Sequence, residues 1–128
     1  MTVSEALLNC ISAALDGREC ALTLAPDDWT VLLRLAGEQK LLPLVYAAVR
    51  GTPGFAAAPE AVRAAARRQT MREAAAQTVH TEAFLRLYQA LRAEGLAPVV
   101  VKGIVCRALY PQPELRPSSD EDLYLTAA

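Results

Sequence analysis

Two aspartates near the end of the chain, Asp120 and Asp122, have the spacing of a shared cation site. On a β-strand, residues i and i+2 point to the same side and lie roughly 6.5–7 Å apart along the chain. Two carboxylates placed in this way can share a hard divalent cation such as Mg²⁺, which prefers oxygen ligands and substrate phosphates. An Asp-x-Asp pattern is also common in solvated acidic loops, so the pair alone leaves both interpretations open.

A second element with chemical potential is the pair Lys102-Gly103, which follows the β-branched run Val99–Val101. A glycine at the point where a strand turns into a helix lets a phosphate approach backbone N–H groups at the positive helix end. Lys102 would add a positive charge there. The alternative is that Gly103 only makes a tight turn and that Lys102 extends into solvent.

The first two-thirds of the chain, which must support these elements, is predicted to be helical. Val3–Leu15 forms a first helix that Gly17 can close, and a second helix starts at Pro26 with an aspartate cap. Pro43 restarts the chain as a short third helix. The first helix is expected to pack through an apolar stripe made of Leu7, Leu8, Ile11, Ala14 and Leu15.

The longest periodic segment runs from Pro59 to Glu94, with Pro59 at the first helical position and Gly95 just past the end. At about 1.5 Å per residue this helix is roughly 50 Å long. Its expected packing stripe is Val79, Ala83, Leu87 and Ala90, flanked by Phe84, Tyr88 and Leu91. His80, beside the stripe, is interpreted as a packed or rim histidine. A cluster of arginines is interpreted as a solvated face, with a phosphate or nucleic-acid contact as the alternative: Arg63, Arg67, Arg68 and Arg72.

After Gly95 the pattern changes to strands. A short, buried strand enters through Pro98, a short helix covers Ile104–Tyr110, and a second strand covers Glu121–Leu125. The predicted fold class is therefore α+β, mainly α, with a helical region over residues 1–95 and a strand-helix-strand unit over residues 96–128.

Composition excludes several classes of protein. A chain of 128 residues, 53% of them hydrophobic, can form a core without disulfide or metal cross-links. Its thirteen basic and fourteen acidic residues lack the excess of positive charge that a general nucleic-acid binder has. No apolar run approaches the roughly 20 residues of a membrane helix. The three cysteines have no metal-ligand spacing, which favours reduced thiols in a cytoplasmic protein.

In this order, the two chemical elements resemble the nucleotidyltransferase superfamily that includes polymerase-β-like enzymes. The phrase Arg116-Pro-Ser-Ser-Asp-Glu-Asp-Leu123 resembles its Ser-Asp-x-Asp-Leu signature. The sequence is most similar to a branch of bacterial nucleotidyltransferase family proteins in which Lys-Gly replaces the usual Gly-Ser. Other phrases typical of that branch are Trp29–Ala36, Leu42–Tyr46 and Ala93–Gly103.

The resemblance implies a set of roles. Asp120 and Asp122 would be the catalytic, Mg²⁺-binding pair that holds a nucleoside triphosphate. Gly103 would line the triphosphate site. Lys102 and Arg116 would be phosphate partners, and Ser119 would belong to the same nucleotide site. The reaction would transfer a nucleotidyl group to an acceptor hydroxyl or phosphate, whose identity the sequence does not give.

Two departures from the family pattern limit this expectation. The serine of the Gly-Ser pair is absent, and no acidic residue follows Asp122 to supply the third carboxylate of the superfamily. The chain is therefore expected to be the N-terminal part of such an enzyme and inactive alone. The alternative is a non-catalytic helical interaction module with a vestigial Asp-x-Asp. Self-association through the long helix or an exposed strand edge is expected in either case.

Overall fold

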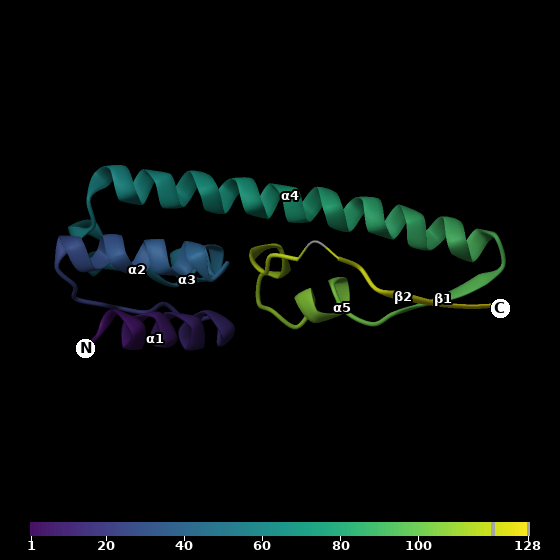
Figure 1. Cartoon of the computed structure of the whole chain (residues 1–128), viewed down its shortest axis with the longest axis horizontal. Helices are drawn as coiled ribbons and strands as arrows, with labels where there is room; N and C mark the ends of the chain where they lie inside the picture. The colour runs from purple at the N-terminus through teal and green to yellow at the C-terminus, as the bar shows by residue number, and fades with distance from the viewer. Residues whose placement is uncertain (119, 128) are drawn as a thin grey trace. The chain divides into compact units, whose positions relative to one another are not determined.

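The protein is described by a computed structural model that covers residues 1–118 and 120–127. It confirms a mainly helical α+β fold with one long helix and two strands (Figure 1). The elements, in order, are α1 (Val3–Leu15), α2 (Pro26–Glu38), α3 (Leu42–Val49), η1 (Pro53–Ala57), α4 (Glu60–Ala93), β1 (Leu96–Val100), α5 (Ile104–Arg107), η2 (Pro113–Leu115) and β2 (Leu123–Ala127).

The chain divides into two compact units, residues 1–73 and 74–128. The boundary falls inside α4, so each unit includes part of this helix. Because the division describes packing only, the predicted boundary at residue 95 between helical region and strand-helix-strand unit remains a prediction. No helix in the described part of the chain is both long enough and apolar enough to cross a bilayer.

Helix α1 has the bounds that the sequence predicts, and both ends have a local cause. The Thr2 hydroxyl accepts from the Glu5 N–H at 3.1 Å, and the Glu5 carboxylate accepts from the Thr2 N–H at 2.7 Å. This capping box satisfies two N–H groups that the helix leaves free, and the backbone hydrogen bond from Thr2 lowers the pKa of Glu5. At the other end Gly17 has φ +69°, a left-handed conformation that ends a helix cheaply.

The predicted aspartate cap of α2 is wrong. The N-cap residue is Ala25, in an extended conformation and without a side-chain cap. Pro26 takes the first helical position, which suits its fixed φ, and the residue before a proline is driven to extended backbone. Asp27 and Asp28 follow in the first turn, where their charges face the positive end of the helix.

Unit 1 is built around α1, α2 and α3, which pack on one another, with η1 against α2 (Figure 1). Trp29 is fully buried and meets the ring of Phe55 edge-on, with 5.3 Å between the ring centroids. Tyr46 meets the same ring at 6.0 Å. The start of α4 closes this core with Val62 and Ala66.

The stripe predicted for α1 is confirmed only in part: Leu7 is buried, and Ile11 and Ala14 pack half-buried against the core. Its buried residues are Ala6, Leu7, Cys10 and Ala13, whereas Leu8 is 66% exposed and Leu15 is 46% exposed. Three of the four buried side chains are small, which lets the backbone of α1 approach α3 closely. Side-chain size rather than hydrophobicity alone thus selects the packed face.

The three cysteines, Cys10, Cys20 and Cys106, are free thiols. Cys10 is fully buried, and this burial, together with the neighbouring Cys20 thiol, raises the pKa of Cys10 to about 12. A thiol whose pKa is higher in the folded chain stabilises the fold below the unfolded pKa of about 8.5 and loses that contribution as the pH rises towards 12.

We therefore expect the free energy of unfolding to fall between pH 8 and pH 10.5, and to fall less in Cys10→Ala. Urea unfolding of both proteins at the two pH values measures the difference, and lysine and tyrosine titration cancels in the comparison. An equal pH dependence in both proteins would contradict the assignment to Cys10.

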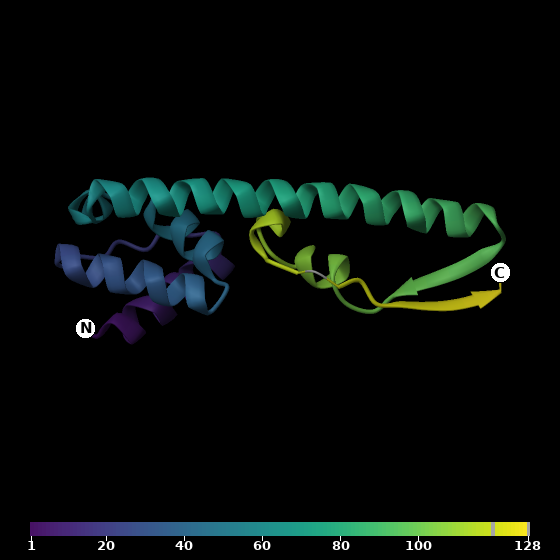
Figure 2. The same cartoon turned by 45° about the horizontal axis from the view of Figure 1, so that its top comes forward.

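Unit 2 contains the two-stranded antiparallel sheet, in which Leu96 pairs with Ala127 and Val100 pairs with Leu123 (Figure 2). Pro98 lies inside β1, not at its entrance, and β2 starts two residues later than predicted. The valine run is also less buried than predicted. Val99 is 53% exposed, and its cross-strand partner Tyr124 is 66% exposed, because no described element covers that side of the sheet.

The predicted stripe on the second half of α4 is wrong as well. Val79 is 63% exposed and Leu87 is 50% exposed, whereas Phe84 is buried. The less exposed positions of this half are Gln77, His80, Thr81, Phe84, Tyr88 and Leu91. The packed face is therefore formed by Phe84, Tyr88 and Leu91, which were predicted to flank the stripe. The part of this face that precedes Phe84 is polar.

Candidate functional site

The Lys102-Gly103 turn joins β1 to α5 in a conformation that requires glycine. Gly103 has φ +57° and ψ −110°, the values of the first central residue of a type II′ turn. The Val105 N–H donates to the Lys102 carbonyl at 3.3 Å and closes this turn. The prediction of a tight turn at Gly103 is thus confirmed, and the exposed side chain of Lys102 leaves it at the surface.

Asp120 and Asp122 lie in the segment that leads into β2. The Val101 N–H donates to the Asp122 carbonyl at 3.0 Å, so the strand pairing continues one step beyond the assigned strands. Asp120 and Asp122 are exposed, whereas the side chain of Glu121 between them is only 6% exposed. This alternation of exposure is that of extended chain, although the sequence predicted the aspartates on a strand and they lie just before β2.

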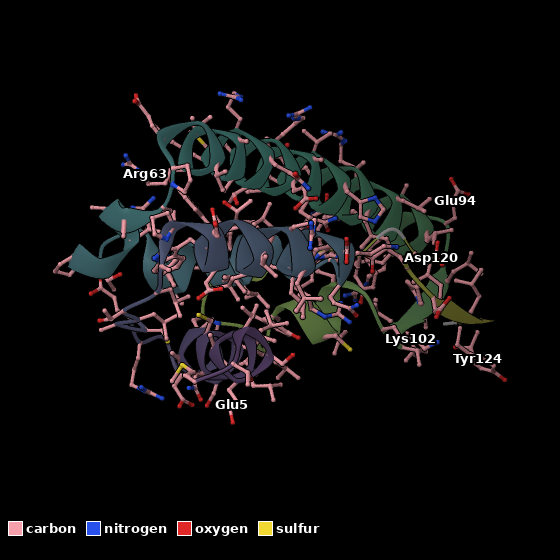
Figure 3. All side chains as sticks on the ribbon, turned by 60° about the vertical axis from the view of Figure 1, so that its left-hand side comes forward. Glu5, Arg63, Glu94, Lys102, Asp120 and Tyr124 are labelled. Atoms are coloured by element: carbon pink, nitrogen blue, oxygen red, sulfur yellow. The ribbon has the colours of Figure 1, made fainter. Side chains whose placement is uncertain are left out.

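The turn and the aspartate segment meet through one exposed ion pair. Lys102 Nζ lies 3.3 Å from Asp122 Oδ2, with the two side chains 71% and 51% exposed. An ion pair this exposed adds little stability. The ion pair matters for the arrangement of the site, because it places the Lys102 ammonium group beside Asp122, one of the two candidate metal ligands. Lys102 and Asp120 both lie at the surface of this unit (Figure 3).

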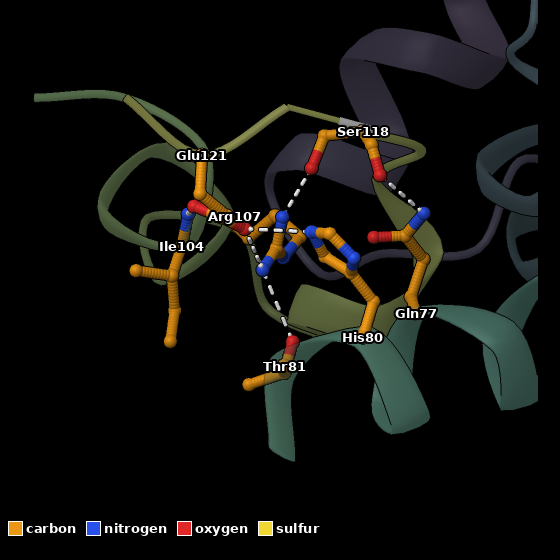
Figure 4. A network of polar contacts seen from close by, with 7 residues as sticks. All are labelled: Gln77, His80, Thr81, Ile104, Arg107, Ser118 and Glu121. Carbon is orange, nitrogen blue, oxygen red and sulfur yellow. Dashed lines mark hydrogen bonds and ion pairs between the residues drawn. The ribbon is translucent and has the colours of Figure 1, made fainter. Parts of the chain in front are cut away.

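On the inner side, Glu121 forms a buried ion pair with Arg107 from the end of α5 (Figure 4). Arg107 Nη2 donates to Glu121 Oε1 at 2.6 Å, and Arg107 is only 1% exposed. The other carboxylate oxygen, Oε2, accepts from the Ile104 N–H at 2.8 Å. Both oxygens of one buried carboxylate are therefore used.

Helix α4 completes this network with three polar side chains (Figure 4). Arg107 also donates to the Thr81 hydroxyl at 3.1 Å and to the Ser118 hydroxyl. Gln77 donates to the Ser118 carbonyl at 2.8 Å, and His80 Nε2 lies 3.3 Å from Glu121 Oε1. These partners explain why α4 turns a polar face to this unit. His80 is a rim residue, as expected, with a carboxylate as its neighbour.

The other two predicted nucleotide-site residues are Arg116 and Ser119. The Arg116 guanidinium lies 5.8 Å from the centre of the Tyr110 ring, a cation–π distance. Within residues 1–118 and 120–127, no hydrogen bond or ion pair joins Arg116 to Lys102, Asp120 or Asp122. The structure thus gives Arg116 a ring partner and leaves its phosphate role a prediction. Ser119 lies outside the described residues.

The absence of a side chain at Gly103 lets other atoms of the protein, and not only a ligand, approach its backbone closely. A Cβ at this position would lie 1.9 Å from Glu121 Oε2 and 2.8 Å from the Asp120 carbonyl oxygen. The Ile104 N–H, one of the donors expected to face a phosphate, already donates to Glu121. A role of Gly103 in lining a triphosphate site therefore stays a prediction, and its demonstrated contact is with the aspartate segment.

Arg107, Glu121 and the polar face of α4 were not predicted from the sequence. One signal could have indicated Glu121: if Asp120 and Asp122 face outward on extended chain, the residue between them faces inward. A buried carboxylate needs a cation or several donors. Arg107, four residues after Gly103 on the predicted short helix, was the nearest candidate in the chain.

A family model described as "uncharacterised nucleotidyltransferase" matches residues 25–128. Because the match covers most of the chain, the protein belongs to this family, and it contains a nucleotidyltransferase-like domain. No match was found among the curated proteins or the solved structures. The family does not favour the alternative of a non-catalytic helical interaction module.

Proposed function

We propose that this protein supplies the Mg²⁺- and nucleotide-binding half-site of a nucleotidyltransferase, which transfers a nucleotidyl group from a nucleoside triphosphate to an acceptor hydroxyl or phosphate. The observation that carries the proposal is the pairing of Lys102 Nζ with Asp122 Oδ2 at 3.3 Å. It brings the Lys-Gly turn beside the Asp-x-Asp segment in a chain of the nucleotidyltransferase family.

The donor set fits magnesium. Asp120 and Asp122 both offer exposed carboxylate oxygens, two residues apart in the chain. Among the described residues, no group of three or more acidic, histidine or cysteine side chains forms a metal cage. Magnesium is commonly held by one or two carboxylates together with water and substrate phosphates, so two aspartates are a sufficient protein contribution.

Each residue has a task in this proposal. Asp120 and Asp122 would hold the metal ion, which neutralises charge on the phosphates when bound. Lys102 has a long, 71% exposed side chain, so its ammonium group can move from Asp122 to a phosphate without disturbing the fold. In the reaction the acceptor oxygen forms a bond to the α-phosphorus, the bond from that phosphorus to the pyrophosphate leaving group breaks, and the proton of a hydroxyl acceptor passes to solvent.

The proposal is tested by replacing both aspartates, Asp120→Asn with Asp122→Asn, and measuring unfolding with and without MgATP. A ligand at 100 times its Kd stabilises the native state by about 2.7 kcal/mol. We expect this stabilisation in the unaltered chain and its loss in the double variant. The asparagines preserve side-chain size, and both sites are exposed, so the fold without ligand should be unchanged.

The matched control is Glu82→Gln with Glu94→Gln, which removes two exposed carboxylates from the same unit and changes the net charge equally. This control should retain the response to MgATP, and ATP without Mg²⁺ should give less stabilisation. No response of the unaltered chain at millimolar MgATP, or an undiminished response in the aspartate variant, would overturn the proposal.

A further inference from the structure

We propose that Glu121 is a positioning residue of the candidate nucleotide site, which ties the Lys102-Gly103 turn to the two aspartates. The inference rests on the proposed function, because positioning matters only if these residues bind a common ligand. Glu121 itself faces away from that ligand: its side chain is 6% exposed, whereas both neighbouring aspartates are exposed.

The carboxylate of Glu121 bridges the two segments by direct contacts. Its Oε2 accepts from the Ile104 N–H at 2.8 Å, directly after Gly103, and thereby fixes the turn. Its backbone belongs to the aspartate segment. A shift of the turn relative to Asp120 and Asp122 would therefore break a hydrogen bond to a buried charge, which is costly.

The fit around this contact leaves little freedom. Oε2 occupies space that a Cβ on Gly103 would need, and the Asp120 carbonyl oxygen closes the same space from the other segment. The absence of a side chain at Gly103 therefore leaves a space, and the Glu121 carboxylate occupies it. Together with the Val101 N–H bond to the Asp122 carbonyl, two independent hydrogen bonds hold the turn and the segment in register.

Arg107 holds the carboxylate in this orientation. It donates to Glu121 Oε1 at 2.6 Å and is itself fixed by the hydroxyls of Thr81 and Ser118 (Figure 4). A buried carboxylate with both oxygens engaged cannot rotate without losing one partner. The ion pair thus connects the backbone between the two aspartates to α4 and α5 through direct hydrogen bonds.

The test compares Glu121→Ala and Glu121→Gln with Glu94→Ala, which removes an exposed carboxylate from the same unit. Two quantities are measured on the full chain, under conditions in which circular dichroism shows every variant to be folded. The first is the Kd for MgATP. The second is the rate of amide hydrogen exchange at Val101 and Ile104, which reports on the two bonds that hold the register.

We expect Glu121→Ala to weaken MgATP binding by about 10–100-fold, the range for residues that orient metal ligands, and to speed exchange at both amides. Glu121→Gln keeps an acceptor of the same shape and should recover part of both losses. Glu94→Ala should change neither. A residue that only stabilises the fold would not alter Kd in folded protein.

Two outcomes would overturn the inference. One is a folded Glu121→Ala variant that binds MgATP with unchanged Kd. The other is unchanged exchange at Val101 and Ile104. If the unaltered chain itself does not bind MgATP, the proposed function fails instead, and the exchange rates still decide whether Glu121 fixes the turn.

Discussion

Replacement of Arg107 by methionine is expected to lower the stability of residues 74–128 by about 3–5 kcal/mol, the usual cost of removing one partner of a buried ion pair. Arg107 is 1% exposed and Glu121 is 6% exposed at the side chain, so neither charge is solvated by water. Methionine fills much of the volume of arginine. The loss therefore comes from the unpaired Glu121 carboxylate and the orphaned Thr81 and Ser118 hydroxyls, not from a cavity.

The double variant Arg107→Met with Glu121→Met separates the effect of the unpaired charge from the effect of packing. An apolar replacement of both members of a buried pair is often neutral or even stabilising. The double variant should therefore be more stable than Arg107→Met alone, although its MgATP binding should remain weak because the positioning carboxylate is gone. Arg86→Met, which removes an exposed arginine from the same unit, should have little effect.

Urea unfolding combined with amide hydrogen exchange measures these differences. Exchange is needed because the chain has two compact units, and a single unfolding midpoint does not describe their separate stabilities. The loss in Arg107→Met should appear in β1, α5 and the bonds to β2, and not in α1–α3. A loss below about 1 kcal/mol, the level of an exposed pair, would contradict the buried-charge interpretation.

The sequence was most informative where a single residue type dictates the backbone. Pro26, Gly17, Gly95 and Gly103 mark an element boundary or turn in the structure, because proline fixes φ and glycine tolerates positive φ. The order of helices and strands follows from these markers and from periodicity. The Lys-Gly turn could be placed for the same reason, whereas the two aspartates were predicted on a strand and lie just before β2, which begins at Leu123.

The packed faces could not be predicted as well, because they depend on partners distant in the sequence. On α1 the small residues Ala6 and Ala13 are buried while Leu8 is exposed, because α3 approaches closely. On α4 the face of Thr81 and His80 is selected by Arg107 and Glu121, not by apolar periodicity.

The buried ion pair was hidden for a related reason. Arginine and glutamate are almost never fully buried unless they are paired, so each was by default a surface residue. The contact between Arg107 and Glu121, 14 residues apart, compensates the burial of both charges together with the hydrogen bonds from the Ile104 N–H and to Thr81 and Ser118. The same contact links the polar face of α4 to the candidate site, which periodicity within α4 cannot reveal.

Substitution of Gly103 by alanine is the second change expected to have a large effect, with a loss of at least about 2 kcal/mol in the stability of residues 74–128. The positive φ of +57° costs an L-residue about 1–3 kcal/mol. The added methyl group would also lie 1.9 Å from Glu121 Oε2 and 2.8 Å from the Asp120 carbonyl, so the turn or the aspartate segment must move. Overpacking of this kind typically adds about 1–3 kcal/mol.

Gly95→Ala is the matched control, because Gly95 also has a positive φ, +80°, but nothing lies within 4 Å of its added Cβ. It should lose only the conformational cost of its own positive φ, so a larger loss in Gly103→Ala reflects the close contact together with the stricter conformation of Gly103, whose ψ is −110°. Glu121→Ala removes the nearest clashing atom but leaves Arg107 unpaired, so the test is the additional loss caused by Gly103→Ala, which should be smaller in a Glu121→Ala background than in the unaltered chain. Urea unfolding of these variants yields each term, and equal losses in Gly95→Ala and Gly103→Ala would show that the turn is not packed against the aspartate segment.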